Sequence, residues 1–218
     1  MYIAIEGVIG VGKTTLAQML QPGFDAELQL EVFEKNPFLA DFYSDRERYA
    51  FQTQIFFLLS RYHQQRRSVR EVLDSGSNLL TDYTFTKDAL FAKVNLTGDE
   101  LEMYYRVHEA LGEKVRLPDL IVYLKAETPV LMQRIAMRDR SYERNMEVDY
   151  IESLNRAYND HFSHHYQGPP VLTLDSNNLD FVAVPEDLKF IEAKINKALE
   201  GALWQAELPL DGRSAGDD

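Results

Sequence analysis

The sequence predicts an α/β protein in which a five-stranded parallel sheet is flanked by helices. Five short apolar runs alternate with longer segments of helical periodicity, and this alternation is typical of such a fold. Each run is apolar on successive residues, as expected for strands that are buried on both faces. The first run leads directly into a glycine-rich segment and then into a helical one. The chain is therefore expected to begin with a strand, a tight loop and a helix.

The other elements follow in order along one domain, expected over residues 1–200, with a flexible C-terminal tail at residues 201–218. The runs expected to form strands are residues 2–5, 28–32, 78–81, 120–124 and 171–174. Helical periodicity covers residues 13–20, 48–73, 87–93, 99–115, 129–138, 148–165 and 185–199. A nearly all-polar segment, about residues 138–147, separates two helical patterns, and we expect it to form a mobile surface lid.

Composition excludes several classes of protein. The 218 residues contain no Cys, which excludes a disulfide framework, Cys-ligated zinc and thiol catalysis. The formal net charge of −12 argues against a broad nucleic-acid surface or an anionic membrane patch, so neither partner is expected. No stretch approaches the roughly 18 apolar residues of a membrane span, and no targeting segment is visible. A cytoplasmic protein is therefore expected.

The glycine-rich segment has the pattern G-x-x-x-x-G-K-[ST], which binds nucleoside triphosphates. Its glycines let successive backbone N–H groups point at phosphate oxygens, and the following helix adds its positive end. Lys13 is expected to reach the β- and γ-phosphates, and the Thr14 hydroxyl is expected to ligate Mg²⁺. The residues predicted to hold ATP here are Gly7, Val8, Ile9, Gly10, Val11, Gly12, Lys13, Thr14 and Thr15.

A phosphate-binding loop alone is compatible with a switch GTPase, a mechanical ATPase or a kinase of a small substrate. The N-K-x-D stretch that reads guanine in GTPases is missing from the chain. A mechanical ATPase would normally be longer and carry partner-binding regions. The sequence therefore favours phosphoryl transfer to a small acceptor.

Glu31 lies at the end of the second predicted strand and is the candidate general base. Ligands of an open parallel sheet sit at the carboxyl ends of its strands, so Glu31 should face the region that the glycine-rich loop also faces. A carboxylate there can accept a hydroxyl proton as the acceptor attacks the γ-phosphorus. An ordinary surface carboxylate is the alternative interpretation.

Several motifs together resemble those of the deoxynucleoside kinase family, especially its bacterial deoxyadenosine/deoxyguanosine kinase branch. Besides the glycine-rich loop, they are the E-x-x-x-x-N-P-F stretch at residues 31–38 and the segments 51–61, 82–92 and 134–143. They occur in the same order as in that family, over about residues 1–199. The resemblance implies a P-loop kinase fold with an arginine-rich lid, ATP or another nucleoside triphosphate as phosphoryl donor, and Mg²⁺.

The resemblance also implies roles for single residues on the acceptor side. Glu31 would be the base near the 5′-hydroxyl of the substrate. Tyr43 and Glu143 match the pair that holds the sugar 3′-hydroxyl. The residues that match those reading the base edge are Gln54, Arg61 and Asp88. An Arg beside an Asp offers fixed donors and acceptors, which suit a purine or cytosine better than thymine.

On the donor side, Asp82 at the end of the third strand is expected to position Mg²⁺ through water. The resemblance places Arg134, Arg138 and Arg140 in a lid that swings over the transferring phosphoryl group. Pairing with nearby carboxylates on a solvated surface is the alternative for these arginines. One departure stands out: Tyr83 occupies a position where Arg is usual, and Lys87, one helical turn further on, could supply the missing charge.

The sequence therefore predicts a kinase that transfers the γ-phosphoryl of ATP to the 5′-hydroxyl of a deoxynucleoside. A purine deoxynucleoside is the favoured acceptor, and deoxycytidine is possible. A nucleoside monophosphate kinase of the thymidylate kinase type and a nucleotide-binding regulatory protein of low turnover are the alternatives. The monophosphate is disfavoured because Glu31 would repel its dianion. A homodimer is expected by analogy with the family, through the apolar stripes of residues 48–73 and 99–115.

Overall fold

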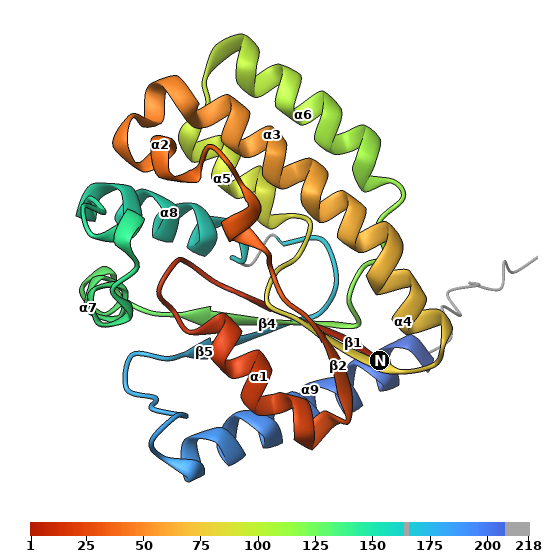
Figure 1. Cartoon of the computed structure of the whole chain (residues 1–218). Helices are drawn as coiled ribbons and strands as arrows, with labels where there is room; N and C mark the ends of the chain where they lie inside the picture. Colours follow the sequence, from red (N-terminus) through yellow and green to blue (C-terminus); the bar gives the residue numbers. More distant parts are fainter. Residues whose placement is uncertain (164–165, 208–218) are drawn as a thin grey trace, which may run out of the picture.

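The computed structural model describes residues 1–163 and 166–207, and within them the chain forms one parallel sheet with helices on both faces (Figure 1). The sheet has five strands in the order β2-β3-β1-β4-β5, and every neighbouring pair is parallel. The strands are β1 (Tyr2–Glu6), β2 (Ala26–Gln29), β3 (Asn78–Thr81), β4 (Leu120–Lys125) and β5 (Val171–Asp175). The predicted fold class and sheet are confirmed.

Nine α-helices, one π-helical turn and two short 3₁₀ turns connect the strands within the described residues. The α-helices are α1 (Lys13–Phe24), α2 (Leu39–Ser44), α3 (Arg46–Gln64), α4 (Arg70–Asp74), α5 (Lys87–Asn95), α6 (Gly98–Gly112), α7 (Thr128–Arg138), α8 (Val148–His161) and α9 (Pro185–Glu207). In Figure 1, α1 and α9 cover one face of the sheet, while α3, α5 and α8 lie on the other face with α6 outside them.

Strand β2 corrects the predicted strand at residues 28–32, because it begins and ends earlier. It pairs only with β3, and that pairing runs from Ala26 opposite Asn78 to Gln29 opposite Thr81, where β3 ends. Beyond this point the backbone N–H of Glu31 donates to the Asp82 carboxylate (2.8 Å) instead of to a strand. Glu31 therefore lies in the loop after the strand rather than in the strand itself.

The long helix predicted at residues 48–73 is interrupted. Asp45 caps α3 by accepting from the Arg48 backbone N–H (3.2 Å), and a π-helical turn, Gln65–Val69, separates α3 from α4. Such turns are often found at functional sites. Helix α2 was not predicted, because six residues are too few for a readable helical period.

The remaining boundaries agree within a few residues, apart from the last helix. Helix α8 ends at His161, and residues 164–165 of its predicted range lie outside the described residues. Helix α9 continues past Gly201, where we expected the tail to begin, to Glu207. The rest of that predicted tail, residues 208–218, also lies outside the described residues. Within the part that the structure describes, no helix is both long and apolar enough to span a bilayer.

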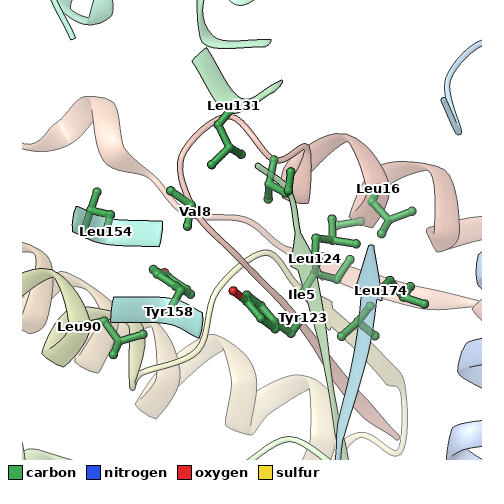
Figure 2. Packing of buried hydrophobic residues seen from close by; sticks show 14 of the residues in the cluster. Ile5, Val8, Leu16, Leu90, Tyr123, Leu124, Leu131, Leu154, Tyr158 and Leu174 are labelled. Atoms are coloured by element: carbon green, nitrogen blue, oxygen red, sulfur yellow. The ribbon is translucent and has the colours of Figure 1, made fainter. Parts of the chain in front are cut away.

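The core lies between the sheet and its two helical layers (Figure 2). Ile5 of β1 and Leu124 of β4 are fully buried, and they pack among apolar side chains from α1, α5, α7 and α8. Tyr123 of β4 and Tyr158 of α8 stack with their ring centroids 6.2 Å apart, so this contact packs α8 against the sheet. The glycine-rich loop leaves the core at Val8, so its starting point is held by the sheet and by α7.

We expect Leu124→Ala to lower the free energy of unfolding by about 2–5 kcal/mol, because truncating a buried Leu loses apolar burial and leaves a cavity. Leu117→Ala is the matched control, since Leu117 is 61% exposed just before the same strand. Its cost should stay within about 0.5 kcal/mol. Urea unfolding followed by circular dichroism measures both variants, and equal losses would contradict the core assignment.

Candidate active site

A cavity of about 730 Å³ opens at the carboxyl ends of the strands. Its wall joins the glycine-rich loop, the loop after β2, helices α3 and α5, and the segment that follows α7. Every site residue predicted from the sequence lines this cavity except Gly7 and Val8, which lie at the buried base of the loop. The structure therefore brings the predicted donor and acceptor residues to one continuous space.

The glycine-rich loop has a backbone that only glycine allows at its tightest points. Gly10 has a φ of +88°, and a Cβ there would lie 2.8 Å from the Leu131 carbonyl oxygen of α7. Gly12 has a φ of +103° at the start of α1, and a Cβ there would meet the Phe181 ring at 3.0 Å. The loop can therefore lie close to α7 and to the segment after β5, with the positive end of α1 facing the cavity.

Lys13, the first residue of α1, lies against this loop. Its ammonium group donates to the carbonyl oxygens of Gly7 (2.7 Å) and Val8 (3.1 Å). Burial, reinforced by the nearby charge of Lys87, lowers the pKa of Lys13 to about 7. An anion bound here would therefore be stabilised by two neighbouring cations.

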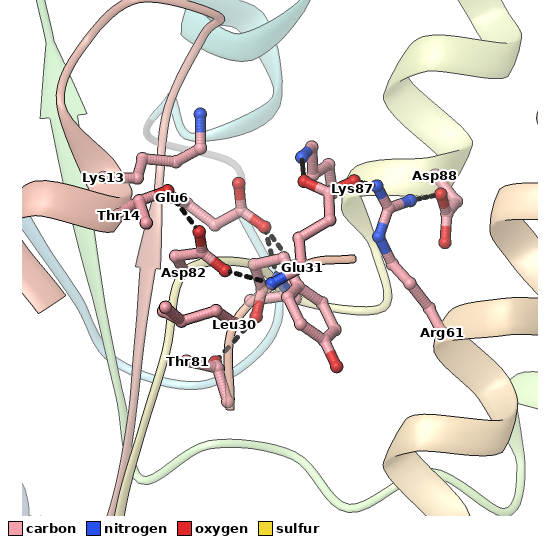
Figure 3. A network of polar contacts seen from close by, with 12 residues as sticks. Glu6, Lys13, Thr14, Leu30, Glu31, Arg61, Thr81, Asp82, Lys87 and Asp88 are labelled. Carbon is pink, nitrogen blue, oxygen red and sulfur yellow. Dashed lines mark hydrogen bonds and ion pairs between the residues drawn. The ribbon is translucent and has the colours of Figure 1, made fainter. Parts of the chain in front are cut away.

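Asp82 connects the two halves of the site. One carboxylate oxygen accepts from the Thr14 hydroxyl (2.5 Å) and the other accepts from the Glu31 backbone N–H (2.8 Å). The side chain is almost completely buried and lines the cavity. Figure 3 shows its contacts with Thr14 and with the segment of Glu31. Asp82 therefore fixes the distance between the start of α1 and the loop that carries the candidate base.

The Thr14 and Asp82 oxygens suit Mg²⁺. Hydroxyl and carboxylate oxygens are hard ligands, and Mg²⁺ is usually held by one or two carboxylates together with substrate phosphates and water. Among the described residues, no group of three or more His, Cys, Asp or Glu side chains could hold a metal ion by itself. The donor set thus fits a cation that arrives with a nucleotide.

Glu31 lies between two cations. One carboxylate oxygen pairs with Arg61 of α3 and the other pairs with Lys87 of α5, as Figure 3 shows. Burial alone would raise the pKa of Glu31, but Arg61, Lys87 and Lys13 outweigh it and hold that pKa well below its usual range. Glu31 is therefore ionised and able to accept a proton.

Arg61 also pairs with Asp88, so it bridges two carboxylates. The Arg61 side chain is 4% exposed and the Asp88 side chain is 1% exposed. Gln54, on the same helix as Arg61, is 2% exposed. All three line the cavity. This juxtaposition of a guanidinium, a carboxylate and an amide is the arrangement expected for reading the edge of a base.

Aromatic rings form part of the wall around these polar groups. Phe33, Phe57 and Phe91 line the cavity. The Arg61 guanidinium lies over the Phe57 ring at 5.1 Å, and the Lys87 ammonium lies over the Phe91 ring at 5.6 Å. Phe51 packs against the hydrophobic core instead.

The predicted sugar-binding pair, Tyr43 and Glu143, lines the cavity. Glu143 is only 4% exposed in its side chain and accepts from Arg138 (Nη2 at 2.5 Å). Arg140 lies 3.7 Å from the same carboxylate, and its guanidinium stacks over the Phe33 ring at 4.0 Å. Tyr43 stacks on Tyr142 with ring centroids 5.9 Å apart. Two predicted lid arginines and the predicted sugar ligand thus form one cluster.

Arg134 makes contacts that the sequence did not indicate. It donates to the carbonyl oxygens of Val11 (3.3 Å), Ser176 (2.6 Å) and Leu179 (3.4 Å). These contacts connect the glycine-rich loop to the segment after β5. A phosphate contact of Arg134 stays a prediction, because here its guanidinium binds backbone oxygens.

Two further polar residues were missed because each lies inside an apolar or helical pattern. Glu6, at the end of β1, is completely buried and accepts from the Thr84 backbone N–H (2.6 Å) and hydroxyl (2.7 Å). Gln64, at the end of α3, donates to the Leu30 carbonyl oxygen (3.4 Å) and accepts from the Tyr83 hydroxyl (3.0 Å). Only Glu6 left a signal in the sequence, because a carboxylate in a buried strand directly before the glycine-rich loop is unusual.

Comparison with known proteins agrees with this geometry. The family model described as "Deoxynucleoside kinase" matches residues 3–200. A deoxyguanosine kinase of Bacillus subtilis is 35% identical over 91% of this chain and 97% of its own length. A deoxyadenosine kinase of Dictyostelium discoideum is 31% identical over 88% of this chain and 78% of its own length.

Solved structures show the same relationship. The structure of the deoxyadenosine kinase from M. mycoides with products dCMP and a flexible dCDP bound superimposes with a TM-score of 0.77, at 27% identity, over 90% of this chain and 99% of that one. The same enzyme with bound dCTP also gives a TM-score of 0.77. Because the family model covers most of the sequence and the relatives align along nearly all of it, this chain belongs to the deoxynucleoside kinase family.

Proposed function

We propose that this enzyme transfers the γ-phosphoryl of ATP, or of another nucleoside triphosphate, to the 5′-hydroxyl of a purine deoxynucleoside. The observation that carries the proposal is the shared cavity: an ionised, nearly buried Glu31 faces the same space as Lys13 and the start of α1. A base and a triphosphate site in one cavity are what phosphoryl transfer to a neutral hydroxyl needs.

In the proposed reaction, the substrate 5′-oxygen forms a bond to the γ-phosphorus and Glu31 accepts the hydroxyl proton. The bond from the γ-phosphorus to the bridging oxygen breaks, and its electron pair stays on ADP. Arg138 and Arg140, now held by Glu143, are the proposed lid residues that neutralise the phosphoryl oxygens. Thr14 and Asp82 would hold Mg²⁺, which would neutralise charge on the phosphates when bound.

Purine preference is supported by three polar residues of the cavity wall. Gln54, Arg61 and Asp88 supply donors and acceptors at fixed positions, and Arg61 is held by two carboxylates. A purine presents two adjacent polar atoms on one edge, which suits a bidentate amide. The Bacillus subtilis and Dictyostelium discoideum relatives carry the names deoxyguanosine kinase and deoxyadenosine kinase.

We further propose a cytoplasmic homodimer. Helices α3 and α6 pack together, and each exposes an apolar side chain, Leu59 (41%) on α3 and Met103 (51%) on α6. Exposed apolar side chains on two neighbouring helices support association with a second copy. Sedimentation analysis of the purified protein measures the oligomeric state.

A phosphoryl-transfer assay tests the proposed function. Labelled ATP is supplied with each of the four deoxynucleosides and each of their monophosphates, and the products are separated. We expect deoxyadenosine or deoxyguanosine to give the highest kcat/KM, and deoxynucleoside monophosphates as products. Turnover of monophosphates alone would show a monophosphate kinase, and no turnover of any acceptor would contradict the proposal.

Glu31→Gln should lower kcat by about 10²- to 10⁴-fold, because the amide cannot accept the hydroxyl proton. The dissociation constant of ATP, measured by calorimetry, should change by less than about threefold, since that value corresponds to under 1 kcal/mol. Glu27→Gln is the matched control, because Glu27 is exposed on β2 and should leave both quantities unchanged. Equal turnover of Glu31→Gln and wild type would remove Glu31 as the base.

Gln54→Leu should lower kcat/KM for the purine deoxynucleoside by about 10- to 100-fold, because buried polar atoms of the base lose their partner. The KM for ATP should not change, since Gln54 lies at the acceptor end of the cavity. The control is Gln52→Leu, two residues away on the same helix and exposed. A similar loss in both variants would point to a helix defect instead of base recognition.

A further inference from the structure

Three cations surround the Glu31 carboxylate, and they differ in how far their charge is already neutralised. Arg61 is paired with two carboxylates, those of Glu31 and Asp88. Lys13 donates to two carbonyl oxygens of the glycine-rich loop. Among the described residues, Lys87 has one ion-pair partner, the Glu31 carboxylate, and its ammonium group lines the cavity.

The fold directs Lys87, and not the neighbouring Tyr83, toward the reacting region. Tyr83 is completely buried, and its hydroxyl donates to Gln64 (3.0 Å) at the end of α3. Lys87 begins α5, and its backbone N–H donates to the Thr84 carbonyl oxygen (3.3 Å). Thr84 is held in turn by the buried Glu6 carboxylate through its N–H and its hydroxyl. Lys87 is therefore held at the cavity wall by a buried polar network.

The ion pair between Lys87 and Glu31 changes when a proton moves. While Glu31 is ionised, the Lys87 charge is neutralised by it. When Glu31 accepts the 5′-hydroxyl proton it becomes neutral, and a nearly buried ammonium group loses its partner. At the same moment the acceptor oxygen joins the phosphoryl group and carries its negative charge into the same cavity. The interaction of Lys87 with that charge is therefore stronger in the transition state than in the ground state, which is the condition for catalysis.

We propose that Lys87 is a catalytic residue, whose ammonium group moves from Glu31 to the 5′-oxygen and the transferred phosphoryl group as Glu31 takes the proton. The proposal rests on the function proposed above. The bonds made and broken are the same: the 5′-oxygen binds the γ-phosphorus, the bridging oxygen leaves with its electron pair on ADP, and the proton stays on Glu31. Lys87 stays protonated throughout and takes part by its charge.

The first experiment separates this catalytic role from a merely structural one. Lys87→Met should lower kcat by about 10²- to 10³-fold, the usual effect of removing one group that stabilises transition-state charge. The dissociation constants of ATP and of the deoxynucleoside, measured by calorimetry, should change by less than about threefold. Lys93→Met is the matched control, because Lys93 is exposed on the same helix and should retain wild-type kcat. Lys87→Arg should recover part of the lost rate.

The second experiment uses the absence of Cys from the chain, which makes Lys87→Cys the only thiol. Alkylation with 2-bromoethylamine restores an ammonium group at nearly the original length, while iodoacetamide adds a neutral amide. We expect the aminoethylated protein to regain at least about tenfold in kcat, and the carbamidomethylated protein to stay as slow as Lys87→Met. Equal recovery with both reagents, or with neither, would overturn the proposal.

Two other outcomes are decisive. Lys87→Met with a kcat within threefold of wild type would overturn the catalytic role of Lys87. A fall in kcat matched by falls in ATP affinity and in unfolding temperature would show that Lys87 only holds the fold, and would also overturn it. Wild-type turnover is measured first with the same acceptors. An inactive wild type would contradict the proposed function, whereas an active one with an unaffected Lys87→Met contradicts only the inference about Lys87.

Discussion

A nearly buried carboxylate held between two cations is the interaction around which this site is organised. Removing Glu31 from water would favour its neutral form, but Arg61 and Lys87 reverse that preference. The two cations come from α3 and α5, so the charge state of the base depends on how these helices pack. An ionised base in a closed space is possible only because the helices bring their cations to it.

Carboxylates at the ends of the strands connect the candidate base to the phosphate site. Asp82 accepts from Thr14 and from the Glu31 backbone, while Glu6 accepts from Thr84 ahead of α5 and from the Tyr158 hydroxyl of α8 (3.3 Å). Each carboxylate satisfies groups from two separate segments, so moving one segment would leave buried polar groups of the other without partners. The donor loop, the base and α5 are therefore positioned as one unit. This arrangement holds Lys87, at the start of α5, beside the base.

The three predicted lid arginines make two different kinds of contact. Arg134 binds backbone oxygens of the loops on both sides of the donor site, so it holds these loops at a fixed separation. Arg138 and Arg140 share the Glu143 carboxylate, which is also the predicted ligand of the sugar. Binding of a sugar hydroxyl at Glu143 would compete with these ion pairs.

The sequence by itself determined the elements whose signals are local. The alternation of runs predicted the parallel sheet, and the glycines around Lys13 predicted a phosphate loop, because their spacing sets the backbone path directly. Glu31 was identified by its place at the end of a predicted strand, although the strand ended earlier than expected, since pairing with β3 stops at Thr81. Only the tertiary structure decided that Lys87 meets Glu31. That contact joins residues far apart in the chain, and it depends on the packing of α5 against α3 and α8, which no local spacing encodes.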